Sequence, residues 1–193
     1  MRSQLFNTTD PSGGTDQDKS MKLESARTPI TTNHIIVLDI GRETSLLKRM
    51  AGEQMRVCKE LPLGLDGLVL QCLRHEPPWP IELEHAIERT EETVMPLAPQ
   101  FSGSHQLVLQ GMSASLMVTA LQACGIFQSV LTLNEVEALF NRLVAISQGR
   151  PSSQEKLSTD VRFFGALLIA REFMHHLHIA VLTLTPNTSP ISV

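Results

Sequence analysis

The residues best suited to chemistry follow a short apolar run near residue 40. Asp39 stands near the end of IIVLDI, and Gly41, Arg42, Thr44 and Ser45 come directly after it. A carboxylate at the end of a strand can hold a metal ion or a water molecule. The following turn can direct backbone N–H groups toward phosphate, and a guanidinium matches phosphate oxygens well. This pattern predicts a phosphate-binding turn, with Asp39 as its catalytic or metal-linked acid.

Each of these residues also has a purely structural explanation. The Asp39 side chain could cap the junction between strand and turn. Arg42 could be a surface residue that pairs with Glu43 or with solvent, while Thr44 and Ser45 could be ordinary turn and strand residues. Both explanations stay open at the level of sequence.

A second glycine of interest lies where a strand meets a helix. Gly111 follows HQLVLQ and precedes the apolar, small-residue segment MSASLMVTALQAC. A glycine at such a junction either permits an unusual backbone turn or allows a phosphate to approach the helix N-terminus. The backbone role is the more common one, and Gly111 is the second expected phosphate-binding position.

Composition narrows the class of protein around these residues. The chain has 193 residues, 42% hydrophobic and 19% charged, with a net charge of -4 and scattered Lys and Arg. No basic stripe marks a nucleic-acid or membrane surface, and neither a secretory signal pattern nor a long apolar run is present. The expected location is therefore the cytoplasm. Cys58, Cys72 and Cys124 lie too far apart for a disulfide framework or a zinc site.

Three regions follow from composition and hydrophobic periodicity. Residues 1–33 are polar and predict a disordered N-terminal tail, residues 34–184 predict one α/β domain, and residues 185–193 predict a C-terminal tail. Within the domain we expect a mixed five-stranded sheet with the core order β-β-β-α-β-α-β. The expected strands are 35–40, 44–50, 55–63, 105–110 and 179–185, and the expected helices include 65–73, one starting at Pro80, 112–124, one capped by Asn134 with Glu137, and 160–177.

Two groups of polar residues receive structural interpretations. The histidines at 175, 176 and 178 end an apolar helix, where the helix dipole favours them; a metal site would need ligands beyond Glu172, the one acid near them in sequence. The acidic run Glu82, Glu84, Glu88, Glu91 and Glu92 is typical of a solvated helix face.

Several segments together resemble the exopolyphosphatase/guanosine pentaphosphate phosphohydrolase (Ppx/GppA) family, specifically its second actin-like subdomain. DIGRETSLL at 39–47 resembles the family's phosphate loop, DIGGGSTEL, and ELPLGLDGL at 60–68 resembles LPLGAVRL. LTLNEVEALFNRLVAIS followed by DVRFFGALLI also resembles the family's helices, in the same order. The resemblance implies an actin-like, ribonuclease-H-like half-domain, with Mg²⁺ as the cofactor of any hydrolysis.

The departures from the family pattern fall on its working residues. Arg42 and Glu43 replace two loop glycines, Leu46 replaces the acid of the loop, and Gln110 replaces the first glycine of a Gly-Gly-Thr turn. The sequence also holds no counterpart of the first subdomain, which in the family supplies the other phosphate loop and the glutamate base. The resemblance therefore implies a catalytically degenerate binding or regulatory module for polyphosphate or guanosine polyphosphates.

Three alternatives remain open. A partner protein could supply the missing actin-like half and restore a phosphoanhydride hydrolase that uses Mg²⁺, with Asp39 as the catalytic residue that orients metal-bound water. The domain could instead be structural and form a homodimer or dock on another protein through the face that the first subdomain would cover. The chain could also descend from a decayed gene with no dedicated activity.

Overall fold

The computed structural model describes residues 34–101, 103 and 106–186. The predicted N-terminal tail, and all of the predicted C-terminal tail except Thr185 and Pro186, lie outside these residues. No helix in the described part of the chain is long and apolar enough to cross a membrane. Cys58 is an exposed thiol, and Cys72 and Cys124 are half-buried thiols.

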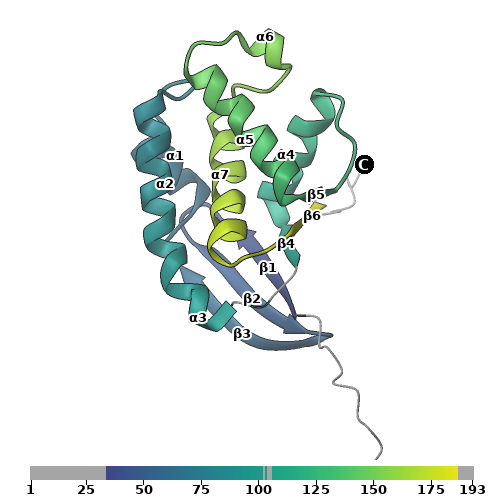
Figure 1. The fold of residues 1–193 in the computed structure, drawn as a ribbon. Coiled ribbons are helices and arrows are strands. Elements are labelled where there is room, and N and C mark those ends of the chain that lie inside the picture. Colours follow the sequence, from purple (N-terminus) through teal and green to yellow (C-terminus); the bar gives the residue numbers. More distant parts are fainter. Residues whose placement is uncertain (1–33, 102, 104–105, 187–193) are drawn as a thin grey trace, which may run out of the picture. The chain divides into compact units, whose positions relative to one another are not determined.

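A six-stranded mixed sheet forms one layer of the domain (Figure 1). Its order is β3-β2-β1-β4-β6-β5, in which β1 pairs in parallel with β4 and β4 with β6, while the other neighbours are antiparallel. The strands are β1 (His34–Ile40), β2 (Ser45–Ala51), β3 (Gln54–Leu61), β4 (Gln106–Gln110), β5 (Val130–Thr132) and β6 (Val181–Pro186). The mixed α/β prediction is confirmed, but its count of five strands is wrong because β5 is only three residues long.

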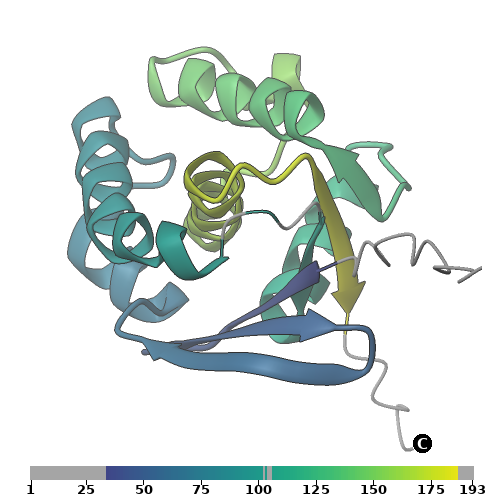
Figure 2. The ribbon, with the colours of Figure 1, turned by 60° about the horizontal axis from the view of Figure 1, so that its bottom comes forward.

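The helices gather around one central helix, α7 (Figure 2). α7 contacts α1, α2, α4 and α5, and it also lies against the sheet. The helices are α1 (Leu65–Cys72), α2 (Pro80–Val94), the 3-10 turn η1 (Met95–Leu97), α3 (Ala98–Phe101), α4 (Gly111–Ala123), α5 (Leu133–Ser147), α6 (Ser152–Glu155) and α7 (Val161–His176). Because other elements surround α7, every residue from Phe163 to Ala170 is buried, and this stretch of the helix is apolar on all sides.

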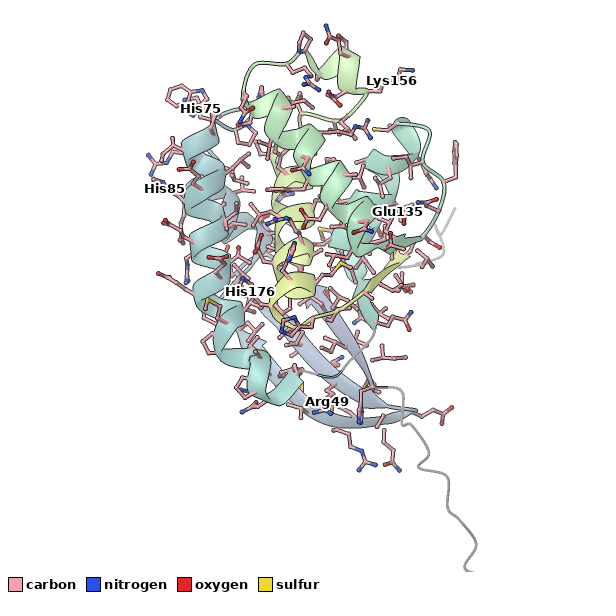
Figure 3. All side chains as sticks on the ribbon, in the orientation of Figure 1. Arg49, His75, His85, Glu135, Lys156 and His176 are labelled. Carbon is pink, nitrogen blue, oxygen red and sulfur yellow. The ribbon has the colours of Figure 1, made fainter. Side chains whose placement is uncertain are left out.

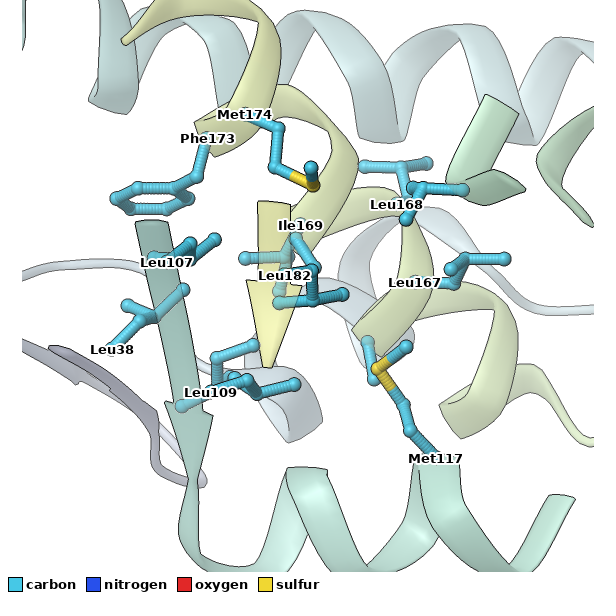
Figure 4. Close-up of a cluster of buried hydrophobic side chains, with 14 of the residues drawn as sticks. Leu38, Leu107, Leu109, Met117, Leu167, Leu168, Ile169, Phe173, Met174 and Leu182 are labelled. Atoms are coloured by element: carbon cyan, nitrogen blue, oxygen red, sulfur yellow. The ribbon is translucent and has the colours of Figure 1, made fainter. Parts of the chain in front are cut away.

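The core lies between α7 and one face of the sheet (Figure 4). Alternate residues of the strands point to this face, so Leu38, Leu107 and Leu182 are fully buried. They meet Ile169 and Phe173 of α7, which are also fully buried. This packing fixes the carboxyl ends of β1 and β4, where Asp39 and Gly111 lie.

The N-cap of α5 differs from the prediction. Thr132, rather than Asn134, caps the helix: its Oγ1 accepts from the N–H of Glu135 at 3.3 Å, and the Glu135 carboxylate accepts from the N–H of Thr132 at 2.7 Å. Asn134 is an exposed residue inside the helix. Both T-L-N-E and N-E-V-E fit a capping pattern. The helix starts two residues earlier than predicted because Thr132, the last residue of β5, is its cap.

We expect Thr132→Ala to lower the free energy of unfolding by about 1 kcal/mol, because the capping hydroxyl is lost. Asn134→Ala removes no capping contact and should change the free energy of unfolding by no more than about 0.5 kcal/mol. Urea titrations followed by circular dichroism measure both values. A larger loss in Asn134→Ala would contradict the assigned cap.

The acidic run on α2 is not uniformly solvated, which corrects the interpretation from sequence. Glu82 is buried at the start of α2, where its carboxylate accepts from the backbone N–H of Trp79 at 2.9 Å and contacts His75 Nδ1 at 2.8 Å. Burial raises the pKa of this carboxyl, but the hydrogen bonds from Trp79, His75 and Arg74 outweigh it and lower the pKa overall. Glu82 therefore anchors the link between α1 and α2.

Candidate functional site

The turn between β1 and β2 rests on the N-terminus of α1. The N–H groups of Leu65 and Asp66 donate to the carbonyls of Gly41 and Arg42, each at 2.9 Å, and Gly67 N–H also reaches the Arg42 carbonyl at 3.2 Å. These donors have no partner inside the helix, so the turn caps α1. The turn is thereby fixed in place, and these α1 amides are already engaged by protein carbonyls.

A cavity of about 300 Å³ opens beside this turn. Its wall combines the end of β1 and the turn after it with the starts of α1, α4 and α7. The lining residues are Asp39, Ile40, Gly41, Arg42, Leu65, Asp66, Gly111, Met112, Ser113, Leu116 and Arg162. Four of the predicted site residues, Asp39, Gly41, Arg42 and Gly111, are therefore brought together in one pocket.

Two arginines converge on one carboxylate at the wall of the pocket. Arg42 Nε lies 2.7 Å from Asp66 Oδ2, and Arg162 donates to Asp66 Oδ1. Arg42 therefore pairs with Asp66 and not with Glu43, the partner considered from sequence. Its guanidinium remains largely exposed, with 78% of the side chain accessible, while the Asp66 side chain is 19% accessible.

Asp66 and Arg162 are site residues that sequence reasoning missed. Arg162 follows the N-cap of α7 and lies far along the chain from Asp66. No local pattern distinguishes either residue from a surface charge. Asp66 comes beside Arg42 because the turn caps α1, a contact that only the folded structure shows.

Asp39 and Gly111 face each other at the bottom of the pocket. Asp39 Oδ2 accepts from Gln110 Nε2 at 3.2 Å. Gly111 is buried with φ at +81°, and a Cβ added there would lie 2.6 Å from Asp39 Oδ1. Only glycine adopts this backbone readily and leaves room for the carboxylate. Gly111 thus has a structural reason that is independent of any ligand.

The two hydroxyls of the predicted turn do not line the pocket. Thr44 Oγ1 donates to Glu60 Oε1 at 2.9 Å, and the buried Ser45 hydroxyl donates to the carbonyl of Leu63. Gly41 lines the pocket, but its N–H donates to the Thr44 carbonyl at 3.0 Å. Of the polar side chains that line the pocket, those of Asp39, Arg42 and Arg162 have partners that are themselves side chains, Gln110 for Asp39 and Asp66 for the two arginines.

The lining residues fit a Mg²⁺ ion only in part. Mg²⁺ is commonly held by one or two carboxylates together with oxygens of substrate phosphates. Asp39 can serve as one such carboxylate, whereas Asp66 is already engaged by two arginines. A Mg²⁺ ion bound here would take one ligand from Asp39 and its other ligands from phosphate and water.

Comparison with known proteins identifies the class of fold. No family model and no curated protein matches the sequence. The mixed sheet and its helices have the architecture of the actin-like domains in Ppx/GppA proteins, which confirms the predicted fold class and resemblance.

The particular solved structures with this fold share little sequence with the chain. The Aquifex aeolicus PPX-GPPA enzyme superposes with a TM-score of 0.61 at 15% identity, covering 79% of this chain and 53% of its own. An exopolyphosphatase-like protein gives 0.60 at 12% identity, covering 79% and 55%. An exopolyphosphatase from Cytophaga hutchinsonii gives 0.55 at 13% identity, covering 81% and 55%. The chain spans about half the length of these proteins.

Proposed function

We propose that the chain is a binding module for guanosine polyphosphates, with the phosphates held between Arg42 and Arg162 in the pocket beside the β1–β2 turn. On its own the module binds the ligand without hydrolysing it. The observation that carries this proposal is the convergence of the two guanidinium groups on Asp66.

Asp66 marks a position where an anionic group is stabilised by two donors. A phosphate carries more charge and more acceptor oxygens than a carboxylate, and guanidinium groups form strong charge-assisted hydrogen bonds with it. The exposed side chain of Arg42 can turn from Asp66 toward a ligand without disturbing the core. Arg162 can then bind the phosphate while it keeps its hydrogen bond to Asp66, or after that bond breaks.

The apolar part of the pocket favours a nucleotide over a simple polyphosphate chain. Ile40, Leu65, Met112 and Leu116 line the cavity beside the arginines. Ligand sites that combine an apolar wall with a few charged groups suit molecules that have both a ring and a charged end. Polyphosphate has no part that would use the apolar wall.

Several features support binding without hydrolysis. Phosphoryl transfer needs charge stabilisation around both the entering and leaving oxygens. Among the lining carboxylates, Asp66 is engaged by two arginines, which leaves Asp39 alone to hold a metal or a water molecule. The position that would carry a second acid by resemblance is Leu46, an apolar residue of β2.

Isothermal titration calorimetry of the full chain with guanosine pentaphosphate tests the proposal. We expect saturable binding that Arg42→Ala and Arg162→Ala each weaken by about tenfold or more, because each removes a charge-assisted hydrogen bond to phosphate. Asp66→Asn should retain or increase the affinity, because it releases both arginines from their internal anion. A flat titration of the unmodified chain would remove the proposal.

The matched control is Arg150→Ala, which removes an exposed arginine that pairs with Glu155 outside the pocket; its side chain is 56% accessible, between Arg162 at 45% and Arg42 at 78%. Its affinity should equal that of the unmodified chain. Phosphate release in the presence of Mg²⁺ should stay at the background rate; release that disappears in Asp39→Asn would contradict the non-catalytic part of the proposal. Weaker binding of polyphosphate than of the nucleotide is also expected.

A second candidate function is a hydrolase completed by another polypeptide. It is favoured by the coverage of about half of the similar structures and by the exposure of Met112, a residue at the pocket that is 67% accessible. A partner half would cover Met112 and supply charge from the opposite side of the pocket. Release of phosphate by the chain mixed with such a partner, and lost in Asp39→Asn, tests this function.

A further inference from the structure

A second cluster of chemically capable side chains lies at the other end of α7. Arg162 is at the start of this helix and His176 at its end, which at about 1.5 Å of rise per residue separates them by roughly 20 Å. The cluster therefore has no part in the pocket described above. It consists of Glu172 and His176 of α7 together with Glu91 of α2.

The two α7 residues are one helical turn apart and lie on the same face. His176 Nε2 is 3.6 Å from Glu172 Oε2 and 3.2 Å from Glu91 Oε1. One ligand atom from each of the three residues lies within 4.8 Å of the others. Figure 3 shows His176 between α7 and the adjoining part of α2.

These distances suit a small divalent ion. Metal–ligand bonds of roughly 2.0 to 2.2 Å at tetrahedral angles separate neighbouring ligand atoms by roughly 3.3 to 3.6 Å. The separations of 3.2 Å and 3.6 Å around His176 are already close to this range. Rotation of the partly exposed Glu91 side chain can shorten the remaining separation.

Arg171 holds one carboxylate oxygen of Glu172 in place, and the other oxygen faces His176. The Glu172 side chain is only 3% accessible, and its Oε1 accepts from Arg171. Arg171 also pairs with Glu137 at 2.8 Å and lies over the ring of Phe140. This network orients Oε1 away from the cluster and leaves Oε2 facing His176, as outer partners of a ligating carboxylate do.

Charge balance also favours a cation. Three carboxylates, those of Glu91, Glu137 and Glu172, share one arginine, Arg171, and two histidines in this network. Glu172 is the buried carboxylate of this network, and Arg171, which pairs with it, also pairs with Glu137.

We propose that Glu91, Glu172 and His176 form a Zn²⁺ site that joins α2 to α7, with water as the fourth ligand. An imidazole with two carboxylates is a ligand set for zinc rather than for Mg²⁺, which prefers oxygen ligands alone. The side chains of Glu91 and His176 are 37% and 24% accessible, which leaves a path for the ion. No sequence pattern reveals the site, because Glu91 lies far from Glu172 along the chain.

The test is titration of the untagged full chain with Zn²⁺, together with thermal unfolding at each concentration. We expect one ion bound per chain and a rise in Tm of several degrees, because the ion binds the folded state. Co²⁺ should give the visible absorption of a four-coordinate site. Excess Mg²⁺ should not reproduce these effects.

Glu91→Gln and His176→Gln should each weaken Zn²⁺ binding by more than about tenfold and remove most of the rise in Tm. Glu84→Gln and His85→Gln change exposed residues of α2 and should bind as the unmodified chain does; Figure 3 shows His85 directed away from α7. Both test variants alter partly exposed residues, so they remain informative if the buried Glu172→Gln variant does not fold. Binding that is unchanged in both test variants, or no binding tighter than about 100 μM in the unmodified chain, would overturn the proposal.

Discussion

Gly64→Ala should lower the free energy of unfolding by about 3 kcal/mol and disturb the pocket at the same time. A Cβ at this position would lie 2.3 Å from the carbonyl oxygen of Arg42 and 2.3 Å from the carbonyl carbon of Glu43. Both atoms belong to the backbone of the β1–β2 turn, so no side-chain rotation relieves the overlap. The turn must move away from α1 and lose the hydrogen bonds from Leu65 and Asp66.

Gly67→Ala is the matched control, because the same methyl group is added three residues away. Its nearest neighbour would be Glu43 Oε2 at 3.7 Å, an ordinary contact. Since Gly67 lies inside α1, alanine should stabilise the protein by up to about 1 kcal/mol. Urea unfolding of both variants measures the difference. If Gly64→Ala proves as stable as Gly67→Ala, the turn does not rest on α1 as described.

Phe173→Ala should lower the free energy of unfolding by about 3 to 5 kcal/mol, through lost burial and the cavity left behind. Phe173 is fully buried on α7, where it meets Leu107 of β4 (Figure 4). The surrounding core also includes Leu38 and Ile169, which are fully buried and have little freedom to fill the space. This change therefore loosens the central helix from the sheet.

Phe127→Ala removes the same side chain from a loop where Phe127 is 76% exposed. It should change the free energy of unfolding by no more than about 0.5 kcal/mol. Denaturant midpoints of the two variants at equal protein concentration provide the comparison. A loss in Phe127→Ala close to that in Phe173→Ala would mean that the loop, rather than α7, carries the packing energy.

Most of the fold was predictable because its elements have strong local patterns. The β-branched run before Gly41 predicts β1, and the apolar segment DVRFFGALLIAREFMHHL predicts α7. β5 escaped prediction because a strand of three residues shows no periodicity of its own. It exists because it pairs with β6, which is a contact between distant parts of the chain.

The candidate site was predictable only where its residues are neighbours in sequence. Asp39, Gly41 and Arg42 share one turn, and Gly111 lies at a recognisable junction of strand and helix. The hydroxyls of Thr44 and Ser45 were expected to face a ligand, but they donate to Glu60 and to the Leu63 carbonyl. Which way a hydroxyl points depends on partners that the local sequence does not specify.

Distant charge partners account for the remaining differences. Arg162 reaches Asp66, and His176 reaches Glu91, only after α7 has packed against α1 and α2. Neither pairing has a spacing that a sequence pattern records.

The strand order implies a definite sequence of events during folding. β1, β2 and β3 are consecutive and antiparallel, so their pairing closes only short loops. β4 and β6 reach the other side of β1 from remote parts of the chain, and their parallel pairing needs long loop closures. We therefore expect the three-stranded meander to form early, with Ile36 and Leu38 still open to solvent. Those side chains become covered only when α7 packs against the sheet. The free edge of β1 is exposed to mispairing until β4 pairs with it.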